Sequence, residues 1–125
     1  MTDPFDINGK IIAITGASSG FGHHFAGVLG SKGATTILGA RRTEKLEERV
    51  KEITSSGGTA KAFNLDVNDK TSITQFFDEA YADYGRIDVL INNAGVEAGA
   101  KTYQTTEEED WNYVIDTNLK SAWMA

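Results

Sequence analysis

The chain has 125 residues, a net charge of −6 at pH 7, no cysteine and a single proline. This length allows one domain. The lack of cysteine excludes disulfide bridges and thiolate metal sites, and the acidic balance argues against general nucleic-acid binding. The N-terminus has no apolar signal core, and no stretch approaches the roughly 20 apolar residues of a membrane span. We therefore expect a cytoplasmic protein with no membrane partner.

The first predicted strand, Lys10–Thr15, leads through a glycine-rich turn into a predicted helix, Gly20–Lys32. Two glycines inside that helix, Gly27 and Gly30, are expected to permit close packing of the helix on a sheet. The spacing of four apolar side chains predicts the buried face of the helix: Phe21, Phe25, Val28 and Leu29.

The middle of the chain continues the alternation of strand and helix. Thr35–Ala40 is the second predicted strand, and the apolar positions of the helix after it are Leu46, Val50 and Ile53. Ala60–Val67 is the third predicted strand. The helix that follows is expected to be capped by Asp69 and ended by Gly85. Its apolar positions are Ile73, Phe76, Phe77, Ala80 and Tyr84.

The fourth predicted strand is Asp88–Asn92. A fourth helix is predicted to begin near Thr105 or Thr106, because Thr-Thr-Glu-Glu-Glu-Asp is a capping-box pattern with acids in the first turn. Its apolar stripe contains Trp111, Val114, Ile115, Leu119 and Ala122. Trp111, Trp123 and Met124 are interpreted either as core residues or as part of an interface.

Alternating strands and helices with short connections predict an α/β fold, a Rossmann-type doubly wound parallel sheet in three αβα layers. The expected strand order is 3-2-1-4, with a ligand between the first and fourth strands. Residues 1–125 are expected to form one NAD(P)-binding domain. The uncapped last helix and the bare apolar edge strand lead us to expect either further chain or a second chain beside that edge.

The glycine cluster after the first strand predicts a phosphate site. Gly16, Gly20 and Gly22 lack Cβ atoms, so backbone N–H groups and a helix N-terminus can approach a pyrophosphate. No Gly-Lys-Ser/Thr follows the cluster, which excludes a P-loop kinase or GTPase. His23 and His24 open the helix beside this site, but no third ligand stands at metal spacing, so we expect no metal.

Two arginines follow the second strand at the distance where a dinucleotide fold holds the adenosine ribose. Arg41 and Arg42 stand there with no acid at Gly39 or Ala40. Guanidinium groups suit a 2′-phosphate, so the sequence favours NADP, with NAD possible. The alternative is that both arginines are solvated residues at a helix start.

Two further segments lie at the same predicted crevice. Asp66 is placed to accept from the adenine amino group, with the Val67 backbone beside it; alternatively, Asp66 is a capping or loop acid. Asn92, Ala94 and Gly95 follow the fourth strand and leave room for ribose and nicotinamide, although a plain turn has the same residues.

These motifs together resemble the short-chain dehydrogenase/reductase family across the whole chain. The Thr-Gly-x-x-x-Gly-x-Gly loop spans residues 15–22, Asn-Asn-Ala-Gly spans 92–95, Asp66-Val67 matches the adenine contact, and Asn118 matches the helix asparagine. The resemblance implies a cofactor site built from Gly16, Ser18, Ser19, Gly20, Phe21, Gly22, Arg41, Arg42, Asp66, Val67, Asn92, Ala94 and Gly95.

The resemblance also implies hydride transfer between nicotinamide and a carbonyl or alcohol substrate, and a homo-oligomer formed through the helix near 106–125. Only Asn118 of the family's catalytic group is present in this sequence. The Tyr-x-x-x-Lys pair is absent, because the four tyrosines are followed four residues later by Gly85, Asp88, Glu107 and Thr117. We expect the chain to supply the cofactor-binding half of an oxidoreductase and to be inactive alone; a non-catalytic nucleotide-binding module is the alternative.

Overall fold

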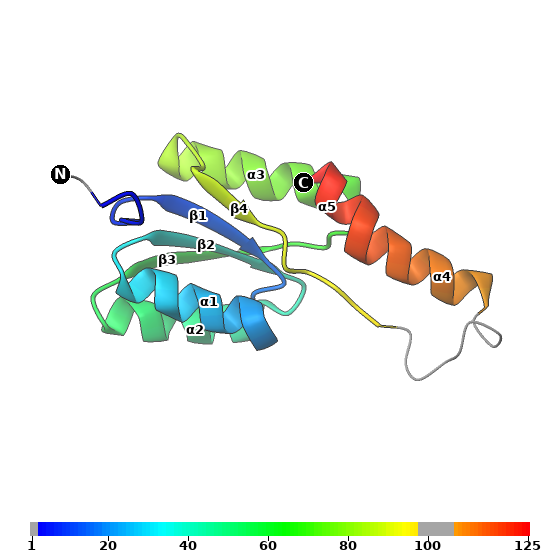
Figure 1. Ribbon diagram of the computed structural model, residues 1–125, viewed down its shortest axis with the longest axis horizontal. Helices are drawn as coiled ribbons and strands as arrows, with labels where there is room; N and C mark the ends of the chain where they lie inside the picture. Colours follow the sequence, from blue (N-terminus) through cyan, green and yellow to red (C-terminus); the bar gives the residue numbers. More distant parts are fainter. Residues whose placement is uncertain (1–2, 98–106) are drawn as a thin grey trace.

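The computed structural model describes residues 3–97 and 107–125. Strands and helices alternate along the chain, with a π-helical turn in the last helical segment (Figure 1). The elements are β1 (Ile11–Thr15), α1 (Gly20–Ser31), β2 (Thr35–Ala40), α2 (Thr43–Ser55), β3 (Thr59–Asn64), α3 (Lys70–Tyr84), β4 (Val89–Ile91), α4 (Glu108–Ile115), the π-turn η1 (Asp116–Lys120) and α5 (Ser121–Met124).

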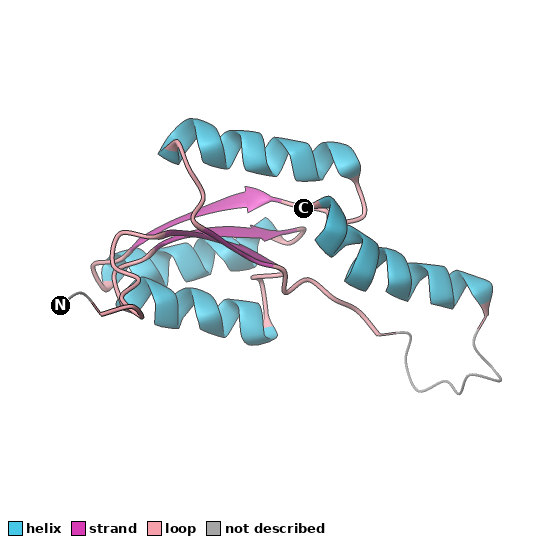
Figure 2. Cartoon of the chain, turned by 45° about the horizontal axis from the view of Figure 1, so that its top comes forward, coloured by secondary structure: helices cyan, strands magenta, loops and turns pink. Residues whose placement is uncertain are grey.

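The four strands form one parallel sheet in the order β3-β2-β1-β4, as the sequence predicts. Helices α1 and α2 cover one face of the sheet, and α3 covers the other (Figures 1 and 2). The chain end after α5 lies beside α3, on the second face. This is the predicted Rossmann-like α/β architecture in three layers.

Two apolar cores lie on opposite faces of the sheet because side chains alternate along each strand. All five residues of β1 are buried, which makes this strand the centre of both cores. Under α1 and α2 the core contains Ile12, Ile14, Ala26, Leu38, Leu46 and Ile53. Under α3 it contains Ile11, Ala13, Ile37, Leu65, Ile73, Phe76 and Ala80.

The predicted buried face of α1 is wrong for three of its four residues; the fourth, Leu29, is partly buried against the core. Phe21 is 76% exposed, and Phe25 and Val28 are exposed as well. The buried positions of α1 are Gly22, Ala26 and Gly30, because α1 packs too closely for large side chains. A Cβ at Gly30 would lie 2.9 Å from Cγ2 of Ile53 on α2. This glycine therefore permits packing between the two helices, and not the predicted packing of helix on sheet.

Three strands are shorter than predicted. β1 begins at Ile11 and not at Lys10. β3 ends at Asn64, three residues before Val67, because the chain turns where Asp66 Oδ1 accepts from the Asn68 backbone N–H at 2.9 Å. β4 spans Val89–Ile91 and excludes Asp88 and Asn92. The predicted limits of α3 are confirmed: Asp69 Oδ1 caps its first turn, and the left-handed Gly85 ends it.

The last helical segment differs most from expectation. α4 begins at Glu108, and Glu107 before it makes no side-chain capping bond. The threonines of the expected capping box, Thr105 and Thr106, lie outside the described residues. Two residues of the predicted apolar stripe, Trp111 and Leu119, are exposed, and the other three are only partly buried: Val114, Ile115 and Ala122. Thr117 and Ser121 are buried instead. Within residues 3–97 and 107–125, no helix is long and apolar enough to cross a membrane.

Candidate functional site

A cavity of about 620 Å³ opens beyond the carboxyl ends of the strands. Its walls are formed by the β1–α1 loop, the β2–α2 turn, the β3–α3 loop and the segment after β4, together with one side of α4 and of the π-turn. The cavity is lined by eleven of the predicted cofactor-binding residues: Gly16, Ser18, Ser19, Gly20, Phe21, Arg41, Arg42, Asp66, Val67, Ala94 and Gly95.

The N-terminus of α1 opens on this cavity. The first N–H groups of a helix have no acceptor within the helix. Ser19, which precedes α1, makes no side-chain capping bond, and the first turn carries no acid. These backbone donors and the positive end of the helix dipole are therefore available to an anion.

The glycine loop is packed directly against the segment after β4. Gly16 has φ +62°, and a Cβ on it would lie 2.8 Å from Cα of Ala94. A Cβ on Gly22 would lie 2.5 Å from Nδ2 of Asn93. The same Asn93 amide donates to the carbonyl oxygen of Gly16 at 3.1 Å. Two glycines thus let the two cavity walls meet.

The β2–α2 turn places both arginines on the cavity wall. Arg41 and Arg42 are exposed and directly follow β2. The backbone oxygen of Arg41 accepts from Asn64 Nδ2 at 3.2 Å, which fixes this turn against β3. In the described part of the chain neither guanidinium forms an ion pair. Two uncompensated positive charges therefore stand at this end of the cavity.

The β3–α3 loop forms the wall next to the arginines. Asp66 Oδ1 accepts from Asn68 N, and the Asp66 backbone N–H donates to Ser72 Oγ at 2.9 Å. The Asp66 carboxylate thus forms a hydrogen bond within its own loop. This is the role of a loop acid, which the sequence left open as the alternative. Asp66 also lines the cavity.

The π-turn holds the wall that follows β4. Asn118 Oδ1 accepts from the Val96 backbone N–H at 2.7 Å, and its Nδ2 donates to the Val96 carbonyl at 2.8 Å. Both halves of the amide are therefore engaged with one backbone residue. π-turns inside α-helices often occur at functional sites, and this one lies beside the cavity.

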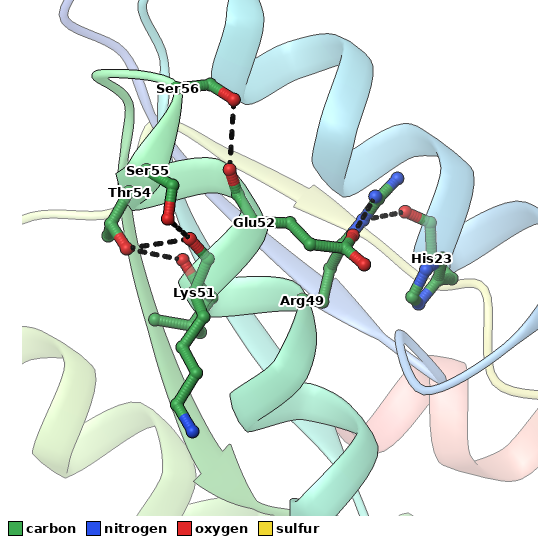
Figure 3. A network of polar contacts seen from close by, with 8 residues as sticks. His23, Arg49, Lys51, Glu52, Thr54, Ser55 and Ser56 are labelled. Carbon is green, nitrogen blue, oxygen red and sulfur yellow. Dashed lines mark hydrogen bonds and ion pairs between the residues drawn. The ribbon is translucent and has the colours of Figure 1, made fainter.

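Helix α1 is tied to α2 by Arg49 (Figure 3). Its Nε donates to the carbonyl oxygen of His23 at 2.9 Å, and its Nη1 pairs with Glu52 at 2.5 Å. Gly27 leaves room for the guanidinium, which a Cβ there would strike. This contact holds the first turns of α1, and with them the glycine loop, at a fixed place relative to α2.

Six lining residues were not singled out from the sequence: Ala40, Leu65, Asn68, Val96, Tyr113 and Thr117. Asn93, which also lines the cavity, belongs to the Asn-Asn-Ala-Gly motif. Tyr113 and Thr117 are four residues apart, so they share a helix face. This spacing is the sequence feature from which both could have been predicted to face the same side. Gly22, Asn92 and Asn118 do not line the cavity. No group of His, Asp or Glu suited to a metal occurs in residues 3–97 and 107–125.

Comparison with known proteins identifies the family. A family model described as short chain dehydrogenase matches residues 10–125. The 3-oxoacyl-(acyl-carrier-protein) reductase FabG of Thermotoga maritima is 38% identical over 117 residues, which are 94% of this chain and 47% of that protein. The chain spans less than half the length of the curated relatives it matches.

Two solved structures share this fold closely. A metagenomic short-chain oxidoreductase in complex with NADP has a TM-score of 0.89 and 37% identity, over 95% of this chain and 54% of that one. A short chain dehydrogenase/reductase from Burkholderia phymatum in complex with NAD has a TM-score of 0.88 and 30% identity, over 96% and 42%. With its parallel sheet, its glycine loop and a family match over residues 10–125, the chain belongs to the short-chain dehydrogenase/reductase family.

Proposed function

We propose that this chain binds NADP in the cavity described above, as the cofactor-binding domain, residues 1–125, of an oxidoreductase. The reaction would transfer a hydride between nicotinamide and a carbonyl or alcohol substrate. The observation that carries the proposal is the joint presence, in one cavity, of an uncapped helix N-terminus and of Arg41 and Arg42 without acidic partners in the described chain.

The residues present fit a dinucleotide phosphate. The pyrophosphate would be held by the N–H groups of Ser19, Gly20, Phe21 and Gly22 at the start of α1. A Cβ on Gly20 would meet nothing within 4 Å, so the cavity is open at this residue. The 2′-phosphate would pair with Arg41 and Arg42, because guanidinium binds phosphate through two parallel hydrogen bonds.

The rest of the cavity would hold the bases and the second ribose. Asp66 and the Val67 backbone would contact adenine. Ala94 and Gly95, which line the cavity, would border the nicotinamide ribose, and Asn92 would lie next to them without lining it. Two structural neighbours are in complex with NADP and with NAD, which supports NADP as the ligand, with NAD possible. When bound, the nicotinamide supplies or accepts the hydride.

The chain's own contribution to chemistry would be Asn118, which holds the Val96 backbone with both amide atoms. The sequence contains no Tyr-x-x-x-Lys pair to exchange the substrate proton. We therefore expect nucleotide binding without substrate turnover by this polypeptide alone. The alternative function, a non-catalytic nucleotide-binding module, predicts the same outcome.

The test is a calorimetric titration of the chain with NADPH and with NADH, repeated for Arg41→Ala. Loss of one charge-assisted contact of about 1.5–3 kcal/mol should reduce the NADPH preference roughly ten- to a hundredfold. NADH affinity should change little, because NADH has no 2′-phosphate.

The matched control is Lys51→Ala, which removes one positive charge from an exposed position of α2 away from the cavity. This variant should keep the wild-type ratio of the two affinities. An unchanged ratio in Arg41→Ala would contradict the 2′-phosphate assignment. Absence of binding by either dinucleotide would contradict the proposed function itself.

We further propose that α4, the π-turn and α5 form the interface of a homo-oligomer. Their exposed large apolar side chains are Trp111, Tyr113, Leu119 and Trp123, with Trp123 84% exposed. Clusters of exposed aromatic residues are typical of protein interfaces. Sedimentation velocity should show a larger species for the wild type than for Trp123→Lys; identical profiles would contradict this interface.

A further inference from the structure

Two consecutive residues of the π-turn contact two different walls of the cavity. Asn118 holds Val96, which follows β4. Thr117 hydrogen-bonds with Asn68, which belongs to the β3–α3 loop. Neighbouring residues of a regular α-helix point about 100° apart, and the wider π-turn lets both side chains reach the cavity walls. The π-turn therefore connects walls that come from distant parts of the sequence.

The contact between Asn68 and Thr117 spans 49 positions. Asn68 Nδ2 donates to Thr117 Oγ1 at 2.9 Å, and the same hydroxyl lies 3.3 Å from Asn68 Oδ1. Thr117 is only 4% exposed, so its hydroxyl lies away from bulk water. Ser121 Oγ donates to the Thr117 carbonyl, which adds a bond within the helix at the same residue.

Asn68 also belongs to the hydrogen-bonded turn that presents Asp66. Its backbone N–H donates to Asp66 Oδ1 at 2.9 Å, and the Asp69 N–H donates to the Asp66 carbonyl at 3.1 Å. A chain of contacts thus runs from the Asp66 carboxylate through Asn68 to Thr117. The residue that follows Thr117 in the sequence is Asn118.

Asn68, one member of this pair, lies where two cavities meet. Val67, Asn68 and Tyr113 line both the first cavity and a second one of about 650 Å³. Val67 and Met124 pack against one apolar cluster. Packing as well as the polar pair therefore connects the β3–α3 loop with the last helical segment.

We propose that Asn68 and Thr117 are positioning residues that couple the adenosine end of the cavity to the π-turn and hence to Asn118. The ligand-dependent part rests on the proposed function, because a nucleotide at Asp66 is what would bias the loop. Coupling of this kind requires that one ligand stabilises one arrangement of both segments. Neither residue needs to touch the reacting atoms.

Three variants test the coupling. Thr117→Val removes the hydroxyl and keeps the branched shape. Thr117→Ser keeps the hydroxyl and should restore the wild-type behaviour. The matched control is Thr74→Val, which removes a helical threonine hydroxyl that bonds only to the Lys70 carbonyl on the exposed side of α3.

The first measurement is hydrogen exchange of the chain without nucleotide. In Thr117→Val, the amides of Asn68 and Asp69 should exchange about three- to tenfold faster, the factor for one lost hydrogen bond. Thr117→Ser and Thr74→Val should match the wild type at both amides. Unchanged exchange in Thr117→Val would overturn the coupling.

The second measurement uses adenosine 2′,5′-bisphosphate, which contains the adenosine end of NADP alone. The chain has two tryptophans, Trp111 on α4 and Trp123 on α5, so its tryptophan fluorescence reports on this helical segment. In the wild type and in Thr117→Ser, fluorescence should change along the same curve as the calorimetric heat. In Thr117→Val, the heat should remain and the fluorescence change should be lost.

The outcomes separate the two proposals. Heat with equal fluorescence changes in the wild type and in Thr117→Val would overturn the coupling and leave the proposed function intact. Absence of binding heat would contradict the proposed binding of the adenosine end of NADP. The exchange rates of the Asn68 and Asp69 amides would still decide whether Asn68 and Thr117 couple the loop to the helix.

Discussion

Asn93 donates two hydrogen bonds to Thr15 across the gap between β1 and the segment after β4. Thr15 Oγ1 accepts from the Asn93 backbone N–H at 3.0 Å, and Asn93 Nδ2 donates to the Thr15 carbonyl at 3.2 Å. The same hydroxyl accepts from the Ala94 N–H at 3.0 Å. One buried threonine thus holds the glycine loop and the Asn-Asn-Ala-Gly segment together.

We expect Thr15→Val to lower the free energy of unfolding by about 2–4 kcal/mol, because two partly buried N–H groups lose their acceptor. Thr15 is 1% exposed, so water cannot replace the hydroxyl without rearrangement. Chemical denaturation measures the change. Thr15→Ser keeps the acceptor and should recover most of the stability; if it is as unstable as the valine variant, the methyl group and not the hydroxyl is what matters.

A second buried threonine provides the opposite case. Thr36 on β2 is fully buried, and its Oγ1 has no hydrogen-bond partner among the residues that the structure describes. Thr36→Val replaces an unsatisfied hydroxyl with a methyl of similar size, so it should raise stability by about 1 kcal/mol. The same denaturation assay would show a loss of stability if this hydroxyl were satisfied.

The strand order and the glycine loop were predictable because each depends on local pattern. Apolar β-branched runs between helical segments define a parallel sheet, and β3-β2-β1-β4 follows from its usual winding. The buried face of α1 was not predictable from apolar spacing. Phe21 and Phe25 are exposed because the close approach of α1 to its neighbours selects Gly22, Ala26 and Gly30 for the buried side.

The ends of the strands depend on contacts between distant residues. β4 stops short because side chains replace its ladder: Asp88 takes the N–H of Ile11, and Thr15 takes the N–H of Asn93. Likewise, the Asn68–Thr117 pair joins positions 49 apart, and neither residue belongs to a motif that marks it. A single sequence shows local hydrophobic periodicity and motif spacing, but it does not show which distant residues form a hydrogen bond.

Two glycines of α1 should respond differently to alanine. In Gly22→Ala, the new Cβ would lie 2.5 Å from Asn93 Nδ2 and 2.6 Å from the Gly16 carbonyl oxygen, which is backbone. We expect a loss of about 1–3 kcal/mol in unfolding free energy from this overpacking. The measurement is thermal or chemical denaturation, with nucleotide affinity as a second readout, because the glycine loop would be displaced.

Gly27→Ala is the matched control in the same helix. Its Cβ would meet the end of the flexible Arg49 side chain, which can move away. The gain of about 1 kcal/mol in helix propensity should roughly offset the lost bond from Arg49 to the His23 carbonyl. A Gly27→Ala variant as unstable as Gly22→Ala would mean that the Arg49 contact, and not the fit of the loop, dominates the stability of α1.

The stability of the sheet should depend on pH through Asp88. Its carboxylate accepts from the Ile11 N–H at 2.8 Å and pairs with Arg86, and the backbone bond is the main cause that lowers the Asp88 pKa below its ordinary value of 3.8. A carboxyl whose pKa is lower in the folded state contributes its full stability above the unfolded-state pKa. That contribution is lost as the pH falls through the folded-state pKa.

Asp88→Asn should therefore be less stable than the wild type at pH 7, and the difference should shrink as the pH falls below about 4. Denaturation midpoints measured between neutral pH and pH 2 provide the comparison. Asp78→Asn, which changes an exposed carboxylate on α3, should follow the wild-type curve throughout. A constant difference between Asp88→Asn and the wild type at every pH would show that packing at this position, and not the ionised carboxylate, supports β1.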